Sequence, residues 1–74
     1  MVNTPLLKGK IVSEGYTQKE FSKKIGMSAQ SLNYKINNNR EFKVSEIEAI
    51  CSILNITNKD EYFFTVKVDK TATN

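Results

Sequence analysis

The sequence predicts an all-α fold: a compact bundle of four to five short helices, with a candidate β-strand near the C-terminus. The chain has 74 residues, which is enough for one small domain. Apolar residues recur three and four positions apart through much of residues 5–57, the spacing of helices that bury one face. Capping residues begin these stretches and glycine or asparagine ends them, so each helix is expected to be short.

The first helix is predicted over residues 5–14. Thr4 is a favourable N-cap, and Pro5 is tolerated at the first helical position, because the N–H that it lacks would have no helical partner there. Gly15 suits the end of this helix, since glycine adopts the left-handed conformation without penalty.

The second helix is predicted over residues 18–25. Thr17 and Glu20 have the spacing of a capping box, in which each side chain accepts a hydrogen bond from the backbone N–H of the other residue. Gly26 follows at the position where this helix must stop.

The third helix is predicted over residues 29–36, with Ser28 as its N-cap. Leu32 and Ile36 lie four residues apart and are expected to face the core, which leaves an unusually polar outward face. That face carries Ala29, Gln30, Asn33 and Tyr34. The second and third helices, joined by a tight turn, form a helix-turn-helix pattern. Exposed amides and a phenol on such a helix suit the base edges and phosphates of a DNA groove.

Three asparagines at residues 37–39 predict a loop, because asparagine bonds its own backbone in competition with the helix. A fourth helix is predicted over residues 46–54, with Ser45 and Glu48 as a second capping box. A further helical turn is expected over residues 59–62.

The periodicity changes near the C-terminus. Apolar residues there alternate with polar ones, which predicts a strand over residues 62–68. The alternating residues are Phe64, Val66 and Val68. The polar remainder, residues 69–74, is expected to be disordered. We therefore interpret residues 1–68 as a single domain with a helical core at residues 5–57.

Positive charge is concentrated beside the helix-turn-helix pattern. Residues 1–43 hold eight basic residues against three acidic ones, a net charge of +5. Residues 44–74 hold three basic residues against five acidic ones, a net charge of −2. This distribution is what a phosphate-binding surface on the first part of the chain requires.

The sequence lacks the residues that several other functions need. The chain has no histidine, and Cys51 is its single cysteine, so a zinc site, histidine-based catalysis and an intramolecular disulfide are not expected. We predict no enzymatic activity, no cofactor and no membrane association, and no small-molecule ligand is evident from the sequence. The single cysteine and the lack of a long apolar run favour a cytoplasmic location.

Residues 5 to about 57 resemble the Cro/repressor-type, or lambda repressor-like, helix-turn-helix family of phage and bacterial regulators. The resemblance is carried by TQKEFSKKIGMSAQSLNYKI, by the asparagine-rich loop after it and by SEIEAICSILNI. With the EYFFTVKV ending, the layout is similar to small repressor-like proteins of Gram-positive phages and prophages. It implies a transcriptional regulator that binds double-stranded operator DNA and represses by occluding a promoter.

The resemblance places the N-terminal part of the third helix in the major groove. The expected base contacts are Ser28, Ala29, Gln30, Ser31, Asn33 and Tyr34. Gln30 can donate to an adenine edge and accept from it at once, and the helix has no arginine, the usual partner of guanine. Positions rich in A·T, or readout of DNA shape, are therefore expected. The expected phosphate contacts are Gln18, Lys35, Asn37, Asn38, Arg40 and Lys43. Two alternatives stay open, namely that Gln18 only favours the first helical turn and that Tyr34 contacts a phosphate.

A homodimer on an inverted repeat is expected, because small DNA-binding domains gain specificity from two half-sites. Phe64, Val66 and Val68 are the expected dimer contacts, since an exposed strand can pair with its own copy. Alternatively, this segment folds back over its own core. The second candidate function is a protein-interaction module, such as an antirepressor or adaptor, although a polar third helix with basic neighbours favours DNA.

Overall fold

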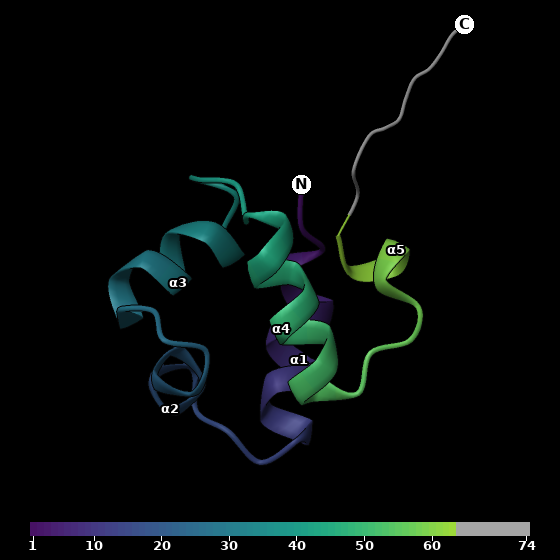
Figure 1. The fold of residues 1–74 in the computed structure, drawn as a ribbon, viewed down its shortest axis with the longest axis horizontal. Coiled ribbons are helices and arrows are strands. Elements are labelled where there is room, and N and C mark those ends of the chain that lie inside the picture. Colours follow the sequence, from purple (N-terminus) through teal and green to yellow (C-terminus); the bar gives the residue numbers. More distant parts are fainter. Residues whose placement is uncertain (64–74) are drawn as a thin grey trace, which may run out of the picture.

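The computed structural model describes residues 1–63, which fold into five α-helices (Figure 1). The helices are α1 (Thr4–Ser13), α2 (Gln18–Lys24), α3 (Ala29–Ile36), α4 (Val44–Leu54) and α5 (Lys59–Tyr62). In Figure 1, α2 and α3 lie on one side of the molecule, α1 and α4 in the middle, and α5 on the other side. Since α1 packs against α2, α3 and α5, it is the central helix. The protein is a small, mostly helical bundle, as predicted.

One apolar core holds the helices together. Its fully buried apolar residues are Leu7, Ile11, Phe21, Leu32, Ile36, Ile50 and Leu54. The two residues from α3, Leu32 and Ile36, are those that the spacing predicted. Full burial of each such side chain contributes about 1.5–3 kcal/mol. The core therefore anchors α3 along one face and leaves the opposite face to solvent.

The predicted start of α2 and both predicted bounds of α3 are confirmed, whereas α2 ends at Lys24, one residue earlier than predicted. The Thr17 N–H donates to Glu20 Oε1 (2.9 Å), and the Glu20 N–H donates to Thr17 Oγ1 (3.0 Å), which completes the capping box. Gly26 has a φ of +74°, a conformation that glycine adopts without strain. Ser28 caps α3, because its Oγ accepts from the Ser31 N–H at 3.1 Å.

The start of α1 differs from the prediction. The cap is Asn3, whose Oδ1 accepts from the Leu6 N–H at 3.2 Å, and not Thr4. The Thr4 hydroxyl instead donates to the main-chain oxygen of Ile36 at 2.6 Å. This bond satisfies a carbonyl in the last turn of α3, which has no partner within its own helix.

The start of α4 also differs, because the helix begins at Val44 and not at residue 46. Glu46 is the third residue of the helix, and its Oε1 accepts from the Lys43 N–H at 2.8 Å. The expected capping box of Ser45 and Glu48 is not formed. Lys43 and Glu46 form only half of a capping box, because a lysine ammonium has no lone pair with which to accept from the Glu46 N–H.

The two ends of the described chain meet beside α5. Val2 is buried and forms an isolated antiparallel bridge with Phe63, whose ring packs edge-on against Phe42 at a centroid distance of 5.6 Å. Tyr62 is the last residue of α5, so the expected strand does not begin at residue 62. Residues 64–68, which carry the rest of that prediction, lie outside the described residues.

Candidate nucleic-acid interface

The outward face of α3 is polar and accessible. Ala29, Gln30 and Asn33 are exposed, and Tyr34 is half-buried. The α2–α3 pair presents this face because Leu32 and Ile36 are fully buried on the other side. The face therefore has the accessibility that a major-groove helix requires.

Tyr34 joins two of the predicted contacts. Gln30 Nε2 donates to the Tyr34 hydroxyl at 2.9 Å. The Arg40 guanidinium lies over the Tyr34 ring, 5.2 Å from its centroid, at a distance typical of a cation–π interaction. Arg40 belongs to the loop after α3. The fold therefore places a guanidinium at the outward face of α3, although the helix itself contains no arginine.

A second network links the start of α2 to the end of α3. Gln18 Nε2 donates to Asn33 Oδ1 at 3.1 Å. Asn37 Nδ2 donates to the same oxygen at 3.0 Å and to the Asn33 main-chain oxygen at 2.8 Å. The side chain of Asn37 thus closes the last turn of α3, and its amide nitrogen is engaged within the protein.

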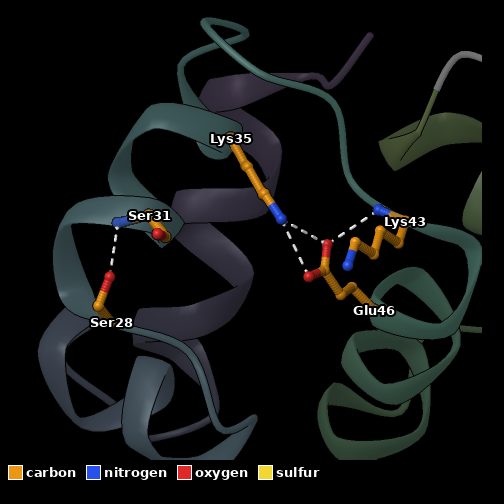
Figure 2. Close-up of polar contacts among 5 residues, drawn as sticks. All are labelled: Ser28, Ser31, Lys35, Lys43 and Glu46. Atoms are coloured by element: carbon orange, nitrogen blue, oxygen red, sulfur yellow. Dashed lines mark hydrogen bonds and ion pairs between the residues drawn. The ribbon is translucent and has the colours of Figure 1, made fainter.

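Lys35 is tied to α4, as Figure 2 shows. Its Nζ donates to both carboxylate oxygens of Glu46, at 2.8 and 2.9 Å, and only 12% of its side chain is exposed. Burial raises the pKa of Glu46, but the bonds from Lys35 and the Lys43 N–H, with both lysine charges, outweigh it and lower that pKa overall. This geometry does not support the prediction that Lys35 contacts a phosphate.

Asn38 is tied to the N-terminal segment. Its Oδ1 accepts from the Val2 N–H at 2.7 Å, and its Nδ2 donates to the Val2 main-chain oxygen at 3.0 Å. Asn38 has a φ of +65°, which asparagine tolerates better than most residues. Its side chain fastens the loop after α3 to the N-terminal segment, so the expected phosphate contact is not supported here either.

The described residues of α2 and of the loop after α3 include several exposed basic groups. Arg40 and Lys43 are exposed in the loop, and α2 presents three exposed lysines that the sequence interpretation left without a role. These are Lys19, Lys23 and Lys24. In the sequence, these three lysines could be noticed only through the clustering of positive charge around the predicted helix-turn-helix. The expected dimer contacts Phe64, Val66 and Val68 lie outside the described residues.

The remainder of the described surface has few other features. A cleft of about 160 Å³ lies between α4 and α5, lined by Val44, Ile47, Glu48, Lys59, Asp60 and Phe63. Within residues 1–63, no cluster of three or more acidic or cysteine side chains is arranged to hold a metal ion. None of the described helices is long and apolar enough to cross a membrane.

Residues 4–66 match the family described as "Protein of unknown function (DUF739)". This match covers most of the chain, so the protein belongs to that family. No curated protein and no solved structure matches the chain.

Proposed function

We propose that this member of the DUF739 family is a sequence-specific, double-stranded DNA-binding transcriptional regulator that represses by occupying an operator. In this proposal α3 lies in the major groove. The observation that supports this proposal most directly is the outward face of α3. There Gln30, Asn33 and Tyr34 take part in polar networks, while the opposite face of the helix is buried in the core. Preordered side chains lose less conformational entropy when they bind.

The charges around α3 support the same proposal. Arg40 lies over Tyr34 of the polar face, Lys43 and three lysines of the neighbouring α2 are exposed, and phosphate neutralisation supplies much of DNA affinity. We assign phosphate contacts to Arg40, to Lys43 and to Gln18, whose bond to Asn33 uses only one of its two amide N–H groups. Lys35, Asn37 and Asn38 are left out, because their side chains are engaged in bonds that hold the fold.

We also propose that the regulator binds as a homodimer. One α3 reads only a few base pairs, whereas two copies related by a two-fold axis read an inverted repeat. The backbone at Phe63, which directly precedes the alternating segment, is extended and forms a bridge with Val2. Pairing of this segment between copies is the proposed dimer contact.

Selection from a random duplex library at near-physiological salt tests the proposal. We expect enrichment of an inverted repeat with half-sites about one helical turn apart. Gln30→Ala should relax one position in each half-site, whereas Ser52→Ala, at an exposed residue of α4, should leave the selected sequence unchanged. If no duplex is retained, a protein-interaction module on the same fold becomes the better account.

A further inference from the structure

The amide of Asn33 is the centre of the network at the start of α2 and the end of α3. Its Oδ1 accepts from Gln18 Nε2 at 3.1 Å and from Asn37 Nδ2 at 3.0 Å. An amide oxygen has two lone pairs, so these bonds use its full acceptor capacity. Asn33 is exposed, and its own Nδ2 has no acceptor among residues 1–63.

A backbone group fixes the direction of these amides. An asparagine amide can turn over and exchange its oxygen and nitrogen. Asn37 Nδ2, however, also donates to the main-chain oxygen of Asn33 at 2.8 Å, and a carbonyl oxygen only accepts. The nitrogen of Asn37 must therefore face α3, which requires the oxygen of Asn33 to face it. Because the Asn33 oxygen can only accept, the amide nitrogen of Gln18 must also face it. The NH₂ group of Asn33 is therefore turned away from both Gln18 and Asn37.

We propose that Asn33 is a donor-only contact that presents two N–H groups to a hydrogen-bond acceptor of DNA. The acceptor is either the O6 and N7 edge of guanine or a phosphate oxygen. This inference rests on the proposed function and deepens it. Bidentate recognition of adenine is disfavoured at this residue, because it needs an amide oxygen that accepts from N6.

The two exposed amides of α3 thereby differ in what they can read. Gln30 Nε2 is bound to the Tyr34 hydroxyl, a group that can donate or accept, so the Gln30 amide is free to turn over. Its Oε1 has no donor among the described residues, and Gln30 keeps the capacity to read adenine. Asn33 adds a group compatible with guanine to a helix that has no arginine.

Asn33→Asp is the test variant. The carboxylate has the same shape and accepts from Gln18 and Asn37, but both outward donors are removed. Asn39→Asp is the matched control, because Asn39 is an exposed loop residue and the change in charge is identical. Site selection and fluorescence anisotropy are carried out with the wild type and both variants.

The outcomes distinguish the two acceptors. If Asn33 faces guanine, Asn33→Asp loses about tenfold or more at that base pair and comes to prefer cytosine, whose N4 amino group donates to a carboxylate. If Asn33 faces a phosphate, the variant weakens binding to every duplex equally, and by more than Asn39→Asp does. The proposal is overturned if Asn33→Asp and Asn39→Asp bind alike, or if the position that depends on Asn33 requires adenine.

A measurement without DNA separates this inference from the proposed function. In nitrogen-15 NMR spectra of the free protein, the side-chain NH₂ protons of Asn37 should be protected from exchange with water, whereas those of Asn33 should exchange freely. Protected Asn33 protons would overturn the donor-only orientation, whatever the protein binds. If no duplex is retained in any selection, the proposed function is overturned, and the DNA acceptor with it. This holds even if the NMR spectra show the expected pattern.

Discussion

Glu46→Gln should loosen the attachment of α3 to α4. The change keeps an oxygen for the Lys43 N–H but removes the charge that holds the Lys35 ammonium at 2.8 and 2.9 Å. Exposed ion pairs contribute about 0.2–1 kcal/mol. Removal of one partner from a buried pair costs about 3–5 kcal/mol. The side chains of Lys35 and Glu46 are 12% and 21% exposed, so we expect a loss of about 1–2 kcal/mol in the free energy of unfolding, between these limits.

Thermal unfolding followed by circular dichroism measures this loss. For a domain of this size, about 1.5 kcal/mol lowers the Tm by roughly 6–12 °C. Glu48→Gln is the control, because Glu48 is exposed on the same helix and forms no ion pair with residues 1–63. It should change the Tm by no more than about 2 °C, as expected for a surface substitution.

The effect should depend on pH in a defined direction. The folded-state pKa of Glu46 is lowered, so its stabilisation is fully present above the ordinary glutamate pKa and is lost as pH falls through the folded-state value. The difference in Tm between the wild type and Glu46→Gln should therefore be largest near neutral pH and shrink below about pH 4. Equal Tm values for Glu46→Gln and Glu48→Gln at pH 7, or a difference that persists in strong acid, would refute the reasoning.

Three further outcomes are expected. Asn38→Ala removes two bonds to the Val2 backbone and should cost about 1–3 kcal/mol, with faster hydrogen exchange at the Val2 amide; unchanged exchange would contradict this role. Thr17→Ala should cost about 1 kcal/mol in urea unfolding, whereas Thr17→Ser should retain the cap and most of the stability. Burial raises the pKa of Cys51, although the charge of Lys59 opposes it, so alkylation at pH 8 should be slower in the folded than in the unfolded protein. Equal alkylation rates would count against this packing.

Interactions between residues close in the chain could be predicted from the sequence. The bounds of α3, the capping box at Thr17 and the turn at Gly26 follow from preferences that operate over three or four residues. The inward direction of Leu32 and Ile36 follows from the helical period in the same way.

Roles that depend on distant partners could not be predicted in this way. Asn38 bonds to Val2, 36 residues away, and Lys35 bonds to Glu46, 11 residues away on another helix. A polar residue beside the expected interface therefore looks like a DNA contact until its partner in the fold is known. The orientation of Asn33 likewise depends on bonds from two different helix ends.

The start of α4 illustrates the same limit. Lys43 with Glu46 and Ser45 with Glu48 have the same spacing, and serine is the better N-cap of the two. Lys35 binds the carboxylate of Glu46, and this contact from α3 favours the earlier helix start. The tertiary ion pair and the earlier helix start thus occur together at Glu46.

The most direct test of the central claim is a nitrogen-15 NMR titration of the protein with the duplex obtained by selection. The account predicts that the largest chemical-shift changes map to the outward face of α3, including Gln30 and Asn33, and to Gln18 and Arg40. A shuffled duplex should cause smaller, salt-sensitive changes at the same basic residues. Changes confined to the α4–α5 cleft around Val44, or no changes at all, would contradict the claim that α3 binds DNA.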